Sequence, residues 1–206
     1  MTGEVTKRRG RPPSGGREAI LAATLELLRQ RGIGRLTTRE VAVVAGVSEA
    51  SIYYHFNDRS GLLQAVFEEG IRPLQELGAE GGLSGPFRRE LLLTLGEAIE
   101  RFLDQALPIL TAAQSDAELR DRLAAYMDEQ DLGPHRGVLA LGSYLADEQA
   151  AGRVRADVDP YAVGLMLVGT CFTRSSQRQM PTHRSELPAL ADIVDALVTL
   201  LRPTGE

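Results

Sequence analysis

Apolar residues recur at helical spacing near the start of the chain. Ile20, Ala23, Leu27 and Leu28 follow one another at intervals of one, three or four positions, which places them on one face of an α-helix. Two glycines follow within six residues, as is typical after a helix C-terminus. The pattern predicts a first helix over residues 17–31.

A capping box marks the start of a second helix. The side chain of Thr37 can accept a hydrogen bond from the backbone, and Glu40 stands three residues later. Leu36 and Val41 flank this pair as a hydrophobic staple. The helix is predicted to end at Gly46, because glycine readily adopts the left-handed conformation found at helix ends.

The same signals recur at once for a third helix. Ser48 is a suitable N-cap, and it lies between the apolar residues Val47 and Ile52. This helix is predicted over 49–55. Two short helices joined by a tight glycine-containing turn form a helix-turn-helix, here at about 38–57.

The outward face of the third helix carries Tyr53, Tyr54 and His55. Such side chains suit contact with phosphates and base edges. Alternatively, one tyrosine ring packs between the first and fourth helices. His135 and His183 are not at ligand spacing from His55, so we expect neither a metal site nor a catalytic histidine.

Helical patterns continue to the C-terminus. Asn57 or Asp58 can cap a fourth helix, which Pro73 kinks or breaks, and a glycine-rich link follows at 78–86. Turn signals then separate five further predicted helices, at about 87–105, 107–130, 134–152, 160–179 and 187–201.

These patterns predict an all-α protein of about nine helices. A three-helix DNA-binding domain at 17–57 would precede a larger helical domain at 58–206. The 206 residues suffice for one or two domains with a sizeable core. Only 5% of residues are aromatic, and no long alternation typical of strands occurs.

Composition excludes several other classes of protein. The longest nearly apolar stretch, 163–172, is much shorter than the roughly 20 residues that span a bilayer. Cys171 is the only cysteine, which excludes an intrachain disulfide and a cysteine-rich zinc site. No nucleophile–base pair, phosphate-binding loop or metal constellation is recognisable. We therefore expect a cytoplasmic protein that is not an enzyme and uses no cofactor.

Positive charge is concentrated at the N-terminus. Residues 1–60 carry ten Arg and Lys against six Asp and Glu, whereas residues 61–206 carry thirteen against twenty-two. Residues 1–16 are rich in Gly, Pro and charge, which predicts a disordered basic arm. Its Arg-Gly-Arg-Pro sequence suggests that Arg9 and Arg11 enter an A·T-rich minor groove. The alternative is a basic tail that adds salt-sensitive affinity.

The segment TTREVAVVAGVSEASIYYHFNDRSGLLQAV, Thr37 to Val66, resembles the signature of the TetR family of bacterial transcriptional repressors. The resemblance extends back through ILAATLELLRQRGIGRLT. It implies a homodimer that binds palindromic double-stranded operator DNA and is released by a small molecule. An activator or an architectural DNA-binding protein without an inducer is the alternative.

The resemblance also implies which residues touch DNA. Thr38 and the start of the second helix would meet phosphate, and Arg59 keeps the charge of a lysine common there. The implied DNA-binding residues are Thr38, Ser48, Glu49, Ala50, Ser51, Tyr53, Tyr54, His55 and Arg59. Glu49 has two interpretations: an acid suited to the positive helix end, or an acceptor for a cytosine amino group.

Members of the family dimerise through their two terminal helices, and the sequence offers apolar stripes for this. Residues on one such stripe could instead form a purely intramolecular core. The predicted dimer interface comprises Val163, Leu167, Thr170, Leu190, Val194, Leu197 and Leu201.

The resemblance places a ligand pocket in the larger domain. A mostly apolar lining with a few hydroxyls would suit a hydrophobic or aromatic effector, although each candidate can also be ordinary core. The candidates are Phe102, Leu110, Tyr126, Met127, Leu139, Tyr144, Met166, Cys171 and Phe172.

Overall fold

A computed structural model describes residues 16–79, 83–180 and 186–203, and in this part of the chain the regular elements are all helical. This confirms the all-α prediction. The elements are α1 (Gly16–Arg31), the 3-10 turn η1 (Ile33–Arg35), α2 (Thr38–Ala45), α3 (Glu49–Phe56), α4 (Arg59–Gly78), α5 (Arg89–Ala113), α6 (Ala117–Glu129), α7 (Pro134–Ala150), α8 (Pro160–Gln179) and α9 (Leu190–Leu201).

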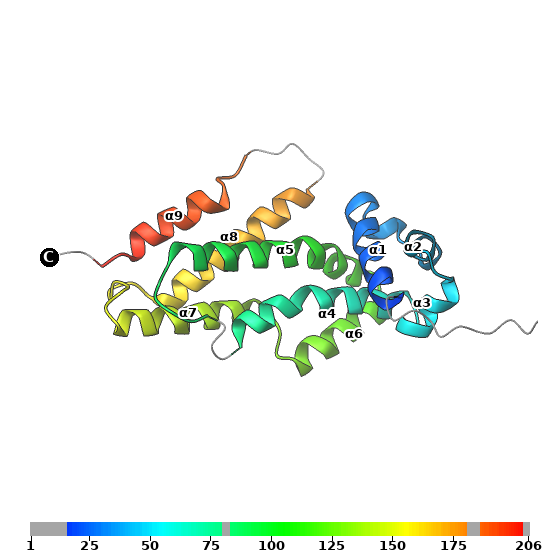
Figure 1. Cartoon of the computed structure of the whole chain (residues 1–206), viewed down its shortest axis with the longest axis horizontal. Coiled ribbons are helices and arrows are strands. Elements are labelled where there is room, and N and C mark those ends of the chain that lie inside the picture. Colours follow the sequence, from blue (N-terminus) through cyan, green and yellow to red (C-terminus); the bar gives the residue numbers. More distant parts are fainter. Residues whose placement is uncertain (1–15, 80–82, 181–185, 204–206) are drawn as a thin grey trace, which may run out of the picture.

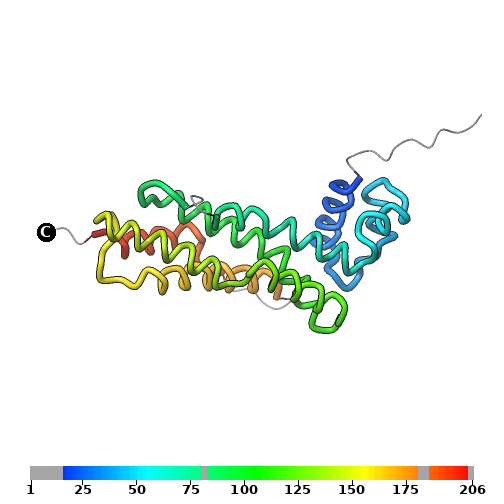
Figure 2. The backbone as a smooth tube through the Cα atoms, turned by 90° about the horizontal axis from the view of Figure 1, so that it is seen from below, coloured from blue at the N-terminus to red at the C-terminus, as the bar shows by residue number. Residues whose placement is uncertain are grey.

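The molecule is elongated, with α1, α2 and α3 at one end (Figures 1 and 2). The helices α4, α5, α7 and α8 run along its length, and α9 finishes at the opposite end (Figure 1). Because α4 follows α3 directly, it connects the small end of the molecule to the larger helical body.

The predicted caps are present. Thr37 Oγ1 accepts from the Glu40 N–H at 3.2 Å, and Ser48 Oγ accepts from the Ser51 N–H at 3.2 Å. Of the two candidates for α4, Asp58 is the cap, with its Oδ1 2.7 Å from the Gly61 nitrogen. Each of these side chains satisfies a backbone N–H that the helix itself leaves unpaired.

The predicted break near residue 106 is wrong. Helix α5 continues through Pro108 to Ala113, and the chain turns only before α6. A proline inside a helix removes one backbone hydrogen bond. Ala106 and Ile109, on either side of Pro108, are both buried, and their packing offsets that loss. Helix α4 likewise continues through Pro73.

Two hydrophobic cores hold the helices together. The first joins α1, α2 and α3 to α4, the last part of α5 and α6, with Ile52, Leu62 and Ile109 fully enclosed. It therefore extends beyond residue 57, where we predicted the first domain to end. The second core packs the first part of α5 against α7, α8 and α9 around Leu92, Leu145 and Leu167.

Glycine permits two close approaches of the backbone. A Cβ on Gly61 would lie 2.1 Å from the Phe56 carbonyl oxygen, so the corner between α3 and α4 requires glycine. A Cβ on Gly164 would lie 2.8 Å from the Val138 carbonyl oxygen. Helix α8 therefore approaches α7 more closely than a larger residue would allow.

A buried carboxylate fixes the segment before α5. Glu148 is 4% exposed, and both of its oxygens accept from Arg153 at 2.6 Å. The same carboxylate accepts from the Phe87 N–H at 2.7 Å. Hydrogen bonding to Arg153 lowers the pKa of Glu148. Tyr144, one turn earlier on α7, donates to the Gly85 carbonyl.

Candidate DNA-binding site

Helix α3 is buried on one face and exposed on the other. Ile52 and Phe56 lie in the first core, whereas Ala50, Tyr53 and Tyr54 face outward. Tyr54 is 78% exposed and Tyr53 48% exposed, so neither ring packs between the first and fourth helices. The outward face predicted from the sequence is therefore present as a free surface.

Polar side chains join the start of α2 to the start of α3. The Thr38 hydroxyl donates to Glu49 Oε1 at 2.6 Å, and the Tyr53 hydroxyl lies 3.5 Å from Thr38 Oγ1. A threonine hydroxyl has one proton, so in this arrangement the Thr38 side chain cannot also donate to phosphate. The backbone N–H groups of Thr38 and Arg39 have no carbonyl four residues back in the helix, and they remain the donors at this helix end.

Ser48 and Ser51 stabilise the start of α3. Besides capping the helix, Ser48 Oγ lies 2.8 Å from Ser51 Oγ. Ser48 is exposed and Ser51 half-buried, so both hydroxyls are close to the surface that Ala50 presents.

The N-terminus of α1 adjoins the end of α3. A Cβ on Gly16 would lie 3.6 Å from His55 Nε2, and the Arg17 guanidinium lies 5.6 Å from the centre of the Phe56 ring. The His55 ring packs edge-on against Tyr54, with centroids 5.1 Å apart. Arg9 and Arg11 lie outside the described residues. Gly16, predicted as the last residue of the arm, is the first residue of α1.

The Arg59 side chain, predicted to contact DNA, has partners within the protein. Its Nε donates to the Leu36 carbonyl at 3.1 Å and its Nη2 to the Ile33 carbonyl at 3.0 Å. Its Nη1 lies 3.8 Å from Oδ2 of Asp116, the N-cap of α6. The guanidinium therefore ties the α1–α2 connection to α6, and a phosphate contact would require it to leave these partners. This internal role was not predictable from local sequence, because Leu36 and Ile33 are more than twenty residues earlier in the chain.

The nine predicted pocket residues do not surround one cavity. Leu139, Met166 and Phe172 are 47%, 57% and 49% exposed, so they lie on the surface. Tyr144 and Cys171 are buried in the second core, where burial raises the pKa of Cys171 to about 12. The other four pack against the first core: Phe102, Leu110, Tyr126 and Met127.

Most of the predicted dimer interface lies inside one chain. Six of its seven residues are buried within the second core, so their side chains are already covered without a partner; Thr170 alone is half-buried. The buried six are Val163, Leu167, Leu190, Val194, Leu197 and Leu201. The opposite face of α8 is the exposed apolar one, where Leu165 is 60% exposed next to Met166, with Phe172 beyond.

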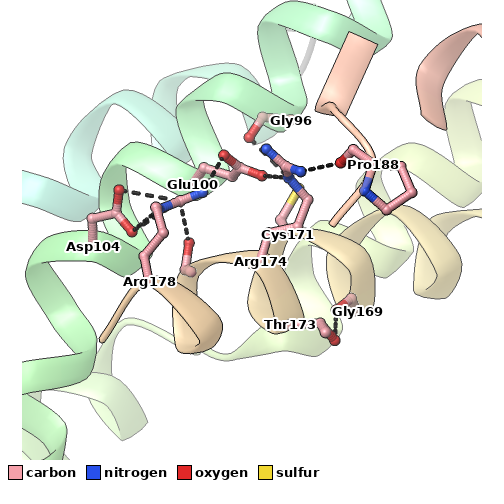
Figure 3. A network of polar contacts seen from close by, with 10 residues as sticks. Gly96, Glu100, Asp104, Gly169, Cys171, Thr173, Arg174, Arg178 and Pro188 are labelled. Atoms are coloured by element: carbon pink, nitrogen blue, oxygen red, sulfur yellow. Dashed lines mark hydrogen bonds and ion pairs between the residues drawn. The ribbon is translucent and has the colours of Figure 1, made fainter. Parts of the chain in front are cut away.

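Ion pairs fix which face of α8 turns inward. Arg174 Nε donates to Glu100 Oε1 at 2.5 Å, and Arg178 contacts both Glu100 at 3.0 Å and Asp104 at 2.9 Å. Arg174 also donates to the Pro188 carbonyl. Figure 3 shows both arginines pointing from α8 to α5, while Thr173 lies on another side of the helix. The α5–α8 contact therefore holds Leu165 and Phe172 outward.

Comparisons with known proteins agree with this arrangement. Residues 20–66 match the model of bacterial regulatory proteins of the tetR family. An uncharacterised HTH-type transcriptional regulator of Mycobacterium tuberculosis is 31% identical over 211 residues, which cover 100% of both chains. The class D tetracycline repressor protein of Escherichia coli is 33% identical over 92 residues, covering 44% of this chain and 42% of that protein.

The solved structures show the same fold. A TetR transcription regulator from Haloarcula marismortui superposes with a TM-score of 0.66 at 18% identity, over 92% of this chain and 99% of that one. Within the described part of the chain, no helix is sufficiently long and apolar to cross a membrane. The full-length match to a regulator, the family segment and the exposed recognition helix together show that this chain is a DNA-binding transcriptional regulator of the TetR family.

Proposed function

We propose that the protein is a homodimeric repressor that binds a palindromic operator and is released from it by a small molecule. The observation that carries this proposal is the outward face of α3. Ala50, Tyr53 and Tyr54 are exposed, while Ile52 and Phe56 hold the same helix in the first core. A recognition helix that is rigid before binding loses little entropy on the DNA.

The proposed contacts follow from the donors and acceptors at this end of the molecule. The N–H groups at the start of α2 and the hydroxyls of Tyr53 and Tyr54 would bind phosphates. Glu49 uses one oxygen for Thr38, which leaves the other to accept from an exposed base amino group. We propose that this carboxylate reads one base in each half-site.

The basic arm would supply most of the non-specific attraction. Four of the ten basic residues in 1–60 precede Gly16, and in 16–60 six basic residues stand against five acidic ones. Gly16, where α1 begins, lies beside His55 of α3. Deletion of residues 1–12 should weaken operator binding and reduce its dependence on salt. An unchanged salt slope would contradict a role for the arm.

The exposed stripe of α8 is the proposed dimer interface. Leu165, Met166 and Phe172 are all at least 49% exposed, and a soluble protein seldom leaves such a cluster uncovered. This face of α8 would pack against the same face of a second chain, which is a symmetric contact. The dimer would place its two recognition helices about 34–36 Å apart, one turn of DNA.

The proposal that the protein represses transcription, and does not activate it, is based on the names of relatives. Several carry the word repressor in their names, including the tetracycline repressors. An activator or architectural protein that needs no inducer would share the DNA-binding end, so the ligand response separates it from the proposed repressor.

The test is selection of bound sequences from random DNA with the full-length protein, followed by measurement of affinity. We expect a palindrome with half-sites one turn apart. Tyr54→Phe should bind it several-fold more weakly, because a phosphate hydrogen bond is lost. Tyr161→Phe, which changes a tyrosine on α8, is the matched control and should bind normally. Failure to enrich any palindrome at low salt would refute the proposal.

A further inference from the structure

A cleft of about 170 Å³ lies where the DNA-binding end meets the larger domain. Three helices form it, and of its residues only Phe102 was among the predicted pocket residues. The lining is Leu25 from α1; Glu69, Gly70 and Pro73 from α4; and Ala98, Arg101, Phe102 and Gln105 from α5.

The interior of the cleft is apolar, with one amide. Leu25 and Phe102 are partly buried and pack against the first core, so their remaining exposed surfaces face a half-open space. A Cβ on Gly70 would lie 3.0 Å from Gln105 Oε1 and 3.6 Å from the Phe102 ring. The glycine therefore leaves room for the amide and for the face of the aromatic ring.

The charges at the rim favour an anion. The Glu69 carboxylate is already paired with Arg72. Arg101 is exposed, and among the described residues it forms neither a salt bridge nor a side-chain hydrogen bond. Because the negative group is neutralised and the positive group is not, the rim has one available cation beside an apolar interior.

We propose that this cleft binds a small aromatic carboxylate. The ring would pack against Phe102 and Leu25, and the carboxylate would accept from Arg101 and from the Gln105 amide. The volume is sufficient for a single six-membered ring with its carboxyl group. The proposal deepens the ligand-responsive function above, on which its regulatory meaning rests, while binding itself does not depend on DNA.

The position of Phe102 connects the cleft to the DNA-binding end. Its ring packs edge-on against Phe67 of α4 at 5.4 Å between centroids, and Phe67 packs against Tyr126 of α6 at 6.4 Å. Asp116, the partner of Arg59, is the N-cap of α6. A ligand that moves Phe102 therefore changes the packing of α6 and of α4, the helix that contacts α3.

Benzoate is the probe, with neutral benzamide as its isosteric control. Binding is measured on the full chain without DNA by calorimetry and by saturation transfer from protein to ligand. We expect a dissociation constant for benzoate on the order of 1 mM, since the probe has few atoms, and roughly tenfold weaker binding of benzamide. Equal binding of the two probes, or no binding of benzoate at about ten times that concentration, overturns the proposal.

Two variants locate the site. Arg101→Gln should weaken benzoate binding roughly tenfold and leave benzamide unchanged, because only the carboxylate loses a partner. Arg202→Gln removes the same charge at the end of α9, at the opposite end of the molecule, and should bind benzoate normally (Figure 1). Equal effects of the two variants would mean that benzoate senses net charge only, which would refute the site. A failed DNA selection would instead refute the proposed function and leave these results intact.

Discussion

Arg122 Nη2 lies 2.8 Å from Asp58 Oδ2, so a side chain of α6 holds the carboxylate that caps α4. The converse contact is present as well. Asp116 caps α6 through Oδ1, and its Oδ2 lies 3.8 Å from Arg59 at the start of α4. Each of the two helices therefore supplies an arginine to the cap of the other. This pair of contacts joins the DNA-binding end to the larger domain.

Breaking the Arg122–Asp58 contact should reduce stability by a small amount. Both side chains are about one-third exposed, which limits the value of the ion pair to less than about 1 kcal/mol. Arg122→Ala should lower the free energy of unfolding in urea by about 0.5 kcal/mol. Arg120→Ala, on the same helix but paired only with its neighbour Asp121, should lower it less. The contact is without energetic effect if a double-mutant cycle with Asp58→Asn gives no coupling.

Glu49 should determine one base of each half-site. Glu49→Gln adds hydrogen-bond donors to a group that otherwise only accepts, so the preference for a base with an amino group should fall roughly tenfold. The measurement is repeated DNA selection with the variant. Glu40→Gln removes the same charge from α2 and should leave base preference unchanged. An identical selected sequence for Glu49→Gln and the wild type would show that Glu49 has only an internal role.

The exposed stripe of α8 should be needed for dimerisation. Leu165→Glu and Phe172→Glu place charges on this surface, so light scattering should show a monomer that remains folded. Val43→Glu changes a side chain that is 77% exposed on α2, and this control should stay dimeric. Leu167→Glu should unfold the chain instead, because that residue lies in the second core. A dimeric Phe172→Glu variant would place the interface elsewhere.

Glu148 should make stability sensitive to acid. The pKa of Glu148 in the folded chain lies below its ordinary value of 4.5. Its contribution to the free energy of unfolding is therefore complete above the ordinary pKa, and it is lost as the pH falls through the lower pKa of the folded chain. Unfolding in urea is followed from about pH 7 to about pH 3. Glu148→Gln should lower the free energy of unfolding by about 2 kcal/mol at neutral pH. On acidification, the free energy of unfolding of this variant should decrease less than that of the wild type. Glu97→Gln, an exposed change on α5, should retain the acid dependence of the wild type.

The sequence was most informative where structure is determined locally. Thr37, Ser48 and Asp58 cap helices through residues three positions away, and those contacts were predictable. The face of α8 that turns inward was not predictable, because the periodicity gives two apolar stripes and does not indicate which one contacts α5. Arg174 and Arg178 decide this by pairing with Glu100, more than seventy residues earlier. The cleft and the Arg122–Asp58 contact likewise depend on helices distant in sequence.

The corner at Gly61 constrains how a lineage of such regulators can change its target. Because a side chain there would collide with the Phe56 carbonyl, the angle between α3 and α4 is inherited with the glycine. The exposed Ala50, Tyr53 and Tyr54 carry no such constraint, since their replacement disturbs no core contact. If α3 reads the operator as proposed, substitutions at exposed positions such as Ala50 would change the preferred sequence while the frame that presents them is preserved.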